Sequence, residues 1–171
     1  MKIPAIKSKL GAVMLIGVAV LAVYWLVMPF YERWPFDWSA AWEWLGWLVA
    51  LGAMLLMESA EWALATRGQG SGFPFDPPRQ LVANGPYHWV RNPIYLAAFA
   101  SILSVAFFLE SLEFLLLALI FLPAMHLYVV LVEEPRLERR FGESYREYKR
   151  LVPRWIPRRP RTPDILEREK E

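Results

Sequence analysis

The sequence contains no cysteine, and several long stretches of it contain no charge. The missing cysteines exclude disulfides, cysteine-based metal sites and a cysteine nucleophile, and they leave the redox compartment undefined. Instead, 56% of the 171 residues are hydrophobic and nine are tryptophan, gathered into blocks rather than spread at amphipathic spacing. Such blocks are typical of an integral membrane protein, whose stability comes from helix packing in lipid.

Four apolar blocks predict transmembrane helices in a single all-α membrane domain. The first, residues 10–28, has no ionisable side chain, and at ~1.5 Å per residue it would span about 28 Å, close to the core of a bilayer. It lacks the small-residue cleavage site of a signal peptide, so we expect it to be retained. The other blocks are residues 40–65, 94–109 and 114–132.

The basic residues predict the orientation of these helices. Three lysines precede the first block, Arg33 alone follows it, three arginines lie between the second and third, and twelve basic residues follow the fourth. None lies between the third and fourth blocks, so 18 of the 19 fall on one side. Under the positive-inside rule both termini are cytoplasmic, and we expect a prokaryotic inner or plasma membrane.

Residues 135–157 predict an amphipathic cytoplasmic segment. Its apolar residues recur at helical spacing, so one face should lie on the membrane or on the other helices, with a break at Gly142. Its arginines alternate with glutamates, which favours attraction to anionic lipid headgroups over nucleic-acid binding. Residues 164–171 are expected to be disordered. The residues of the stripe are Leu137, Phe141, Tyr145, Tyr148 and Val152.

The stretch "NGPYHWVRNPIYLA", residues 84–97, precedes the third block. Asn92 is a preferred helix cap and Pro93 suits the first helical position, so the third helix should begin here. Its free N–H groups and dipole beside Arg91 suit an anion such as a carboxylate. Gly85 permits a tight turn, and the tyrosines and other rings offer flat faces. The alternative is ordinary headgroup-level aromatics with a capping asparagine.

Glu133 and Glu134 end the fourth block, and Pro135 after them is expected to break the chain direction. Carboxylates are unfavourable at a helix C-terminus, so the pair suggests a positive partner, although two glutamates reaching solvent would also explain it. The third and fourth helices form a hairpin across "ESLE", residues 110–113. The hairpin therefore brings the glutamates beside Arg91, and one site would offer an anion-binding helix end and a cation-binding acid pair.

Three motifs in fixed order resemble the isoprenylcysteine carboxyl methyltransferase and phospholipid methyltransferase group of membrane enzymes. The resemblance covers Leu81 to Pro157. It implies S-adenosylmethionine as cofactor and a lipid-like or isoprenoid acceptor at the cytoplasmic face. The motifs comprise Gly85, Tyr87, Arg91, Pro93 and Tyr95, then Glu133 and Glu134, then "FGESYREYKRLVPRWIP", residues 141–157.

In such a site, the carboxylate of the cofactor suits Arg91 and the helix end capped by Asn92. Its ammonium or ribose hydroxyls suit Glu133 or Glu134, and its adenine and sulfonium suit aromatic faces. The resemblance also implies a lid over the cofactor that contains Tyr145, Tyr148 and Arg154.

The only role expected of a catalytic acid or base is to accept or donate the proton of the substrate that receives the methyl group. His126 lies seven residues before Glu133, on nearly the same helix face, and Glu58 and Glu61 lie three apart in the second block. These three residues are the catalytic candidates, although for His126 we favour an interhelical hydrogen bond. No metal is predicted.

The sequence departs from the family at two places. Many members have histidine where this chain has Asn92, which keeps a cap but cannot titrate. The eukaryotic branch has arginines one turn before the glutamate pair, where this chain has Tyr128 and Val129, which argues against a prenylcysteine carboxylate as acceptor. Two other classes stay open: an NADPH-dependent reductase of the sterol-reductase kind, and a non-catalytic scaffold or transporter subunit.

Overall fold

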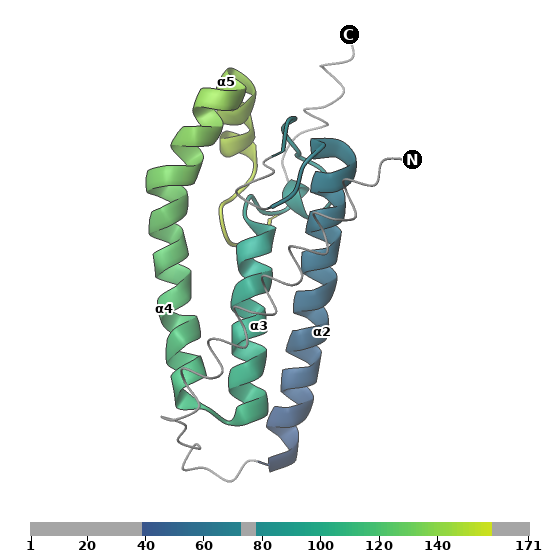
Figure 1. Cartoon of the computed structure of the whole chain (residues 1–171), viewed down its shortest axis with the longest axis vertical. Helices are drawn as coiled ribbons and strands as arrows, with labels where there is room; N and C mark the ends of the chain where they lie inside the picture. The colour runs from purple at the N-terminus through teal and green to yellow at the C-terminus, as the bar shows by residue number, and fades with distance from the viewer. Residues whose placement is uncertain (1–38, 73–77, 159–171) are drawn as a thin grey trace.

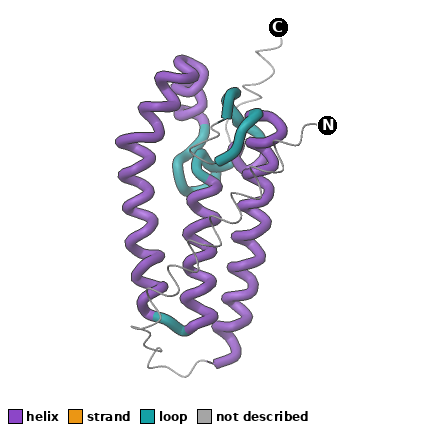
Figure 2. Tube along the Cα trace, in the orientation of Figure 1, coloured by secondary structure: helices purple, strands orange, loops and turns teal. Residues whose placement is uncertain are grey.

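Three long helices stand side by side in the computed structural model, which describes residues 39–72 and 78–158 (Figure 1). They are α2 (Ser39–Ala63), α3 (Pro93–Leu109) and α4 (Leu112–Tyr128), and α5 (Glu134–Leu151) follows α4 at one end of the bundle. All regular structure in these residues is helical (Figure 2). The predicted first span, residues 10–28, and the tail, residues 164–171, lie outside the described residues.

Two helical runs are long and apolar enough to cross a membrane. One is Trp42–Gly68, in which α2 continues into a π-helical turn, Leu64–Gly68, and the other is Leu112–Leu151. The third helix, α3, is a shorter apolar helix of 17 residues. The block predicted at 94–109 is confirmed as a helix within one residue at its start, and the blocks at 40–65 and 114–132 lie inside longer helical runs.

Small residues allow α3 to pack closely against α2. Ala53, Ala60, Ala97 and Ala106 are buried, and a Cβ added at Gly46 would lie 3.1 Å from the ring of Phe108. Large apolar side chains point away from the bundle instead. Helices in lipid use small residues where they meet and leave large apolar residues facing outward, and this distribution fits that pattern. The outward residues include Leu48, Leu51, Leu55, Ile120 and Leu131.

The predicted hairpin between α3 and α4 is present. Glu110 adopts a left-handed conformation (φ 49°, ψ 40°), and its N–H bonds to the carbonyls of Ala106 and Phe107, which ends α3. Ser111 then caps α4, because its hydroxyl accepts a hydrogen bond from the N–H of Phe114 at 3.3 Å. The hairpin therefore places the start of α3 and the end of α4 at the same end of the bundle.

The expected break at Pro135 is wrong, because the helix passes through this residue from α4 into α5. A π-helical turn, Val129–Glu133, precedes it, and the N–H of Glu134 bonds to the carbonyl of Val129. In a π-helical turn each N–H bonds to the carbonyl five residues earlier instead of four. This turn accommodates Pro135, which has no N–H to donate to an α-helical hydrogen bond. The helix is instead broken by a kink at Gly142, where φ is 58° and ψ is −128°, and this confirms the break predicted at that glycine.

The second half of α5 folds back onto the loop before α3. Tyr145, Tyr148 and Val152 form a buried cluster with Ala83, and Leu137 and Phe141 pack against it. The apolar stripe predicted in the C-terminal segment therefore has a protein partner, the loop around Leu81–Ala83. The same loop is tied to the end of α2, because the carbonyl of Gly68 accepts the N–H groups of Arg79 and Gln80 at 2.7 and 3.2 Å.

Candidate functional site

Glu134 is the centre of a buried cluster of charges. Its Oε1 accepts from Nη1 of Arg91 at 3.0 Å and from Nε of Arg154 at 2.7 Å, and its Oε2 accepts from Nη2 of Arg154 at 3.0 Å. Nζ of Lys149 lies 3.3 Å from Oε2. The side chains of Glu134 and Arg91 are only 6% and 8% exposed. One carboxylate therefore joins the start of α3, the end of α5 and the chain that follows it.

These contacts keep Glu134 ionised. Burial alone would raise the pKa of this carboxyl, but the hydrogen bond from Arg154 and the charges of Arg91, Arg154 and Lys149 outweigh it, so the pKa lies below its usual value. The same hydrogen bond raises the pKa of Arg154. Arg91 was expected to hold one end of a ligand, and either Glu133 or Glu134 the other. In the structure Arg91 and Glu134 bond to each other, and Glu134 has its charge satisfied within the protein.

The segment Val152–Arg158, which we call the tail strap, crosses the start of α3. The N–H of Arg91 donates to the carbonyl of Pro153 at 2.9 Å, and the N–H of Arg158 donates to the carbonyl of Trp89 at 3.2 Å. The side chain of Asn92 was expected to cap α3, and it does not. Its Nδ2 donates to the carbonyl of Arg154 at 3.2 Å, because the strap lies within its reach.

The strap also reaches α4. Nε1 of Trp155 donates to Nδ1 of His126 at 2.9 Å. The indole nitrogen can only donate, so Nδ1 of His126 is the acceptor of this hydrogen bond. Among the described residues, the hydrogen bond of His126 is therefore to the strap and not to a neighbouring helix of the bundle.

The neighbouring Glu133 is in a different environment. Its Oε2 accepts the hydroxyl of Tyr95 at 2.8 Å, and burial raises the pKa of this carboxyl, which that hydrogen bond and the charge of Arg136 only partly offset. No ion pair joins it to a lysine or arginine in the part of the chain that the structure describes. The two adjacent glutamates therefore differ, since three cations surround Glu134 and lower its pKa, whereas the pKa of Glu133 is raised by burial and its carboxyl accepts a hydrogen bond from a tyrosine.

A pocket of about 200 Å³ lies at this end of the bundle, between α5, the start of α3 and the loop after α2. Eight of the predicted cofactor-binding residues line it, whereas Gly85, Glu134 and Arg154 do not. Gly85 starts the short 3₁₀ helix Gly85–His88 with φ 62°, so its role is to form the turn. The eight lining residues are Tyr87, Arg91, Asn92, Pro93, Tyr95, Glu133, Tyr145 and Tyr148.

Other lining residues were not identified from the sequence. Arg136, Leu137, Arg140 and Phe141 face the pocket from α5, and Ser71 and Gly72 face it from the loop after α2. The sequence did contain a signal for them. Arg136 and Arg140 are four residues apart, as are Leu137 and Phe141, and residues at this spacing share one face of a helix. The sequence predicts the apolar stripe, but it assigns the arginines of this segment to the membrane surface.

The tyrosines of the pocket are hydrogen-bond donors rather than bases. The hydroxyl of Tyr148 donates to the carbonyl of Tyr87 at 2.7 Å. Burial raises the pKa of Tyr87, Tyr145 and Tyr148 well above the usual value for a phenol. All three hydroxyls therefore stay protonated at physiological pH, and the rings offer uncharged aromatic faces.

The three catalytic candidates lie in different surroundings. Glu58 is exposed on α2 and does not line the pocket. Glu61 lies at its edge, where its two carboxylate oxygens accept the N–H of the lining residue Gly72 at 3.3 and 3.4 Å. His126 bonds to Trp155 and does not line the pocket. Of the three, Glu61 is nearest to the pocket lining.

One polar atom of the pocket has no partner. Nε of Arg91 is buried, and no hydrogen-bond acceptor for it is found among the described residues. An unsatisfied buried donor of a charged group is costly. Because Arg91 lines the pocket, a ligand oxygen is the acceptor that this geometry would accommodate.

The apolar helices, with a pocket of charged and aromatic residues at their end, are those expected of a helical membrane protein with a candidate ligand site. The family described as phospholipid methyltransferase matches residues 42–144. The chain therefore belongs to the phospholipid methyltransferase family, which confirms the resemblance seen in the motifs. Comparisons with curated proteins and with solved structures give no match. The matched range contains Arg91, Tyr95 and both glutamates, and it ends before the tail strap.

Proposed function

We propose that this protein is an S-adenosylmethionine-dependent methyltransferase that methylates a lipid-like acceptor at the cytoplasmic face of the membrane. The family supports a membrane methyltransferase. The observation that supports this cofactor is the pairing, in one aromatic pocket, of the Glu133 carboxylate with the unpartnered Nε of Arg91.

The residues of the pocket fit the groups of the cofactor. Nε of Arg91 and the backbone N–H groups of the first turn of α3 are donors for its carboxylate. Glu133 is the acceptor for its ammonium, because Glu134 is already bound to three cations. The rings of Tyr87, Tyr145 and other aromatic residues suit its adenine and its sulfonium.

The bound cofactor supplies an electrophilic methyl group, so the protein has mainly to align the acceptor and exclude water. Tyr145 and Tyr148, on the half of α5 that folds back, close one side of the pocket. Arg154 does not line the pocket and acts by holding the tail strap in place, and Asn92 both lines the pocket and bonds to the strap. Glu61 is the candidate for receiving a proton from the acceptor, and Glu58 and His126 are less suited because neither lines the pocket.

The membrane topology is part of the proposal. Four spans with both termini in the cytoplasm would place the pocket at the cytoplasmic face, because 18 of the 19 basic residues fall on that side. An acceptor dissolved in the bilayer would then reach the end of α3 and α4 without leaving the membrane.

An NADPH-dependent reductase would need basic residues for the phosphates of its cofactor, and Arg91, Arg136 and Arg140 all line the pocket. The family match now favours the methyltransferase. The family match also favours a methyltransferase over a non-catalytic scaffold, because a scaffold needs no ligand pocket.

The test is transfer of a labelled methyl group from S-adenosylmethionine to a membrane lipid extract by the purified protein. We expect labelled product in the organic phase, lost in Glu133→Gln and retained in Glu110→Gln, which alters the far end of the bundle. Oxidation of NADPH by the protein, with no methyl transfer, would contradict the proposal.

A further inference from the structure

We infer that His126 and Trp155 are positioning residues of the ligand site, and that the hydrogen bond between them is a latch that opens as the pH falls. The latch fastens the tail strap to α4, and the strap in turn holds Arg91 and Asn92 at the start of α3. The inference rests on the proposed function only for its ligand, S-adenosylhomocysteine, because the strap and its contacts are features of the fold.

The latch joins two segments that are 29 residues apart in the chain. Nε1 of Trp155, in the strap, lies 2.9 Å from Nδ1 of His126, in the last turn of α4, and the two ring centroids are 6.2 Å apart. The segment after α5, at the yellow end of the colour bar, runs between α4 and the start of α3 (Figure 1). Among the described residues this hydrogen bond is the one that fastens the strap to α4, since the other bonds of the strap go to α5 and to residues 89–92.

The strap links this contact to the ligand site. The N–H of Arg91 donates to the carbonyl of Pro153 at 2.9 Å. Nδ2 of Asn92 donates to the carbonyl of Arg154 at 3.2 Å. Both accepting residues directly precede Trp155 in the chain, and both donating residues line the pocket. A movement of Trp155 therefore displaces the acceptors that hold two pocket-lining residues.

Arg91 is the pocket residue whose position depends most on the strap. Its side chain is 8% exposed, and its Nε has no acceptor among the described residues. Nη1 of the same guanidinium bonds to Glu134 at 3.0 Å, and Arg154 of the strap bonds to the same carboxylate. The strap thus reaches Arg91 by two routes, through its backbone N–H and through Glu134. The direction of the unpartnered Nε–H therefore depends on where the strap lies.

The protonation state of His126 decides whether the latch can form. The indole nitrogen of Trp155 can only donate, so Nδ1 of His126 must be unprotonated to accept the bond. A protonated imidazole carries an N–H on both ring nitrogens, so two donors would face each other and the bond would be lost. Histidine is the side chain that ordinarily changes charge between about pH 5 and 8. The latch is therefore closed at the higher pH and opens as the pH falls.

The charged groups at this end of the bundle are bonded to partners other than His126. Arg154 of the strap bonds to Glu134 of α5, and Glu133 accepts the hydroxyl of Tyr95 of α3. In the described residues no carboxylate pairs with His126, so a protonated ring in the latched position would have no counter-charge to stabilise it. The titratable side chains that α3, α4, α5 and the strap bring to this end include Tyr95, Tyr128, Glu133, Glu134, Arg154 and Arg158.

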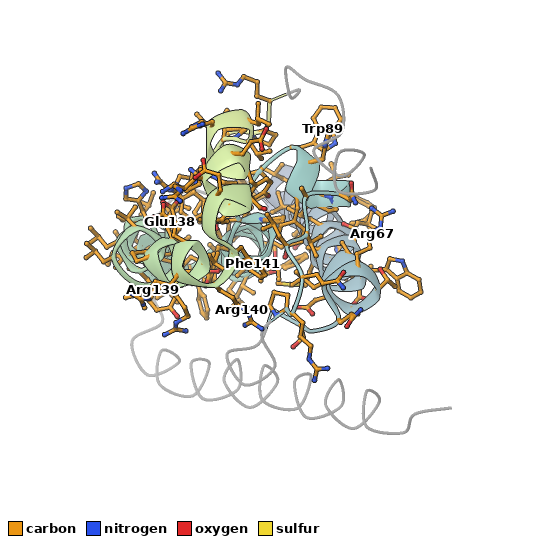
Figure 3. The ribbon with its side chains drawn as sticks, turned by 90° about the horizontal axis from the view of Figure 1, so that it is seen from above. Arg67, Trp89, Glu138, Arg139, Arg140 and Phe141 are labelled. Atoms are coloured by element: carbon orange, nitrogen blue, oxygen red, sulfur yellow. The ribbon has the colours of Figure 1, made fainter. Side chains whose placement is uncertain are left out.

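Four variants separate a latch from a contact that is only structural. His126→Asn is the deciding one, because the Oδ1 of asparagine lies about where the Nδ1 of histidine lies and accepts a hydrogen bond without titrating. Trp155→Phe removes the donor at every pH. His88→Asn is the control for titration, since the chain has two histidines. Trp89→Phe is the control for loss of an indole, because this side chain is 44% exposed and lies at the rim of the bundle when seen from above (Figure 3).

The first measurement is amide hydrogen exchange of the full chain in a non-ionic detergent at about pH 7.5 and about pH 5.5, expressed as protection factors. In the wild type, protection of the strap amides and of the Arg91 amide should fall about fivefold at the lower pH, as for loss of one hydrogen bond. His126→Asn should stay protected at both pH values, and Trp155→Phe should be less protected at both. The two controls should behave as the wild type does. A fall that persists in His126→Asn, or that disappears in His88→Asn, would overturn the latch.

The second measurement is calorimetric titration of S-adenosylhomocysteine at the same two pH values. The wild type and His126→Asn should bind alike at the higher pH, and the wild type should bind about three- to fivefold more weakly than His126→Asn at the lower pH. The two proteins are compared at each pH because burial also raises the pKa of Glu133, whose titration they share. Equal affinities at both pH values would overturn the positioning role. Absence of binding by the folded wild type, with hydrogen exchange responding as expected, would contradict the proposed function and leave the latch in place.

Discussion

Glu134 and Arg91, 43 residues apart in the chain, are joined by a buried ion pair at 3.0 Å. The pair fixes the start of α3 to the start of α5, and Arg154 adds the tail strap to the same carboxylate. The wall of the pocket is therefore held by one acidic side chain.

Replacing this acid should be more damaging than replacing one of its partners. Glu134→Gln leaves the buried cations without a counter-charge and should cost about 3 kcal/mol of stability. Arg91→Met should cost less, because Glu134 keeps Arg154 and Lys149. The melting temperatures of the two variants in detergent test the order. An Arg91→Met protein less stable than Glu134→Gln would contradict this account of the cluster.

The hydrogen bond between Trp155 and His126 should hold the tail strap against α4. Trp155→Phe keeps an aromatic ring but removes the donor, so it should cost about 1 kcal/mol and speed amide hydrogen exchange in Val152–Arg158. Trp89→Phe, at an exposed position, is the control and should leave this exchange unchanged. Unaltered exchange in Trp155→Phe would show that the strap is held without this bond.

Gly72 forms a tight part of the pocket lining. A Cβ there would meet Cδ1 of Ile94 and would lie 2.6 Å from Oε1 of Glu61. Gly72→Ala should therefore displace Glu61 or the loop and lower the melting temperature. Gly52→Ala is the matched control, because nothing lies within 4 Å of its Cβ position and alanine favours a helix by about 1 kcal/mol over glycine. A Gly72→Ala protein as stable as Gly52→Ala would show that the loop yields freely.

The proposed topology predicts where reporters fused to the chain will lie. Reporters after Glu171 and within residues 69–79 should remain cytoplasmic, and one inserted near Asp37 should be exported. The reason is that the basic residues concentrate in the segments assigned to the cytoplasmic side. Alkaline phosphatase and a fluorescent protein at the three sites report the two outcomes. An exported reporter at the C-terminus would contradict the four-span arrangement.

Local signals sufficed to predict much of the fold. The Asn92-Pro93 step gave the start of α3 within one residue, and the short "ESLE" connection predicted the hairpin that brings Arg91 beside the glutamates. Both predictions depend only on residues that are close together in the sequence. The break at Gly142 was likewise predicted from the conformational freedom of glycine.

The contacts missed from the sequence depend on distant residues. Asn92 could be assigned a cap from its neighbours, but the carbonyl that it meets belongs to Arg154, 62 residues away. The partners of Glu134 likewise depend on how the chain folds back after Gly142. Pro135 suggested a break because the π-helical turn that accommodates it is not evident from its neighbours.

The direct test of the cofactor pocket is calorimetric titration of S-adenosylhomocysteine into the wild type, Glu133→Gln and Glu110→Gln. The account predicts binding by the wild type, an affinity about ten- to a hundredfold lower in Glu133→Gln through loss of a charged hydrogen bond, and no change in Glu110→Gln. Absence of binding by the folded wild type, or an equal loss in both variants, would contradict it.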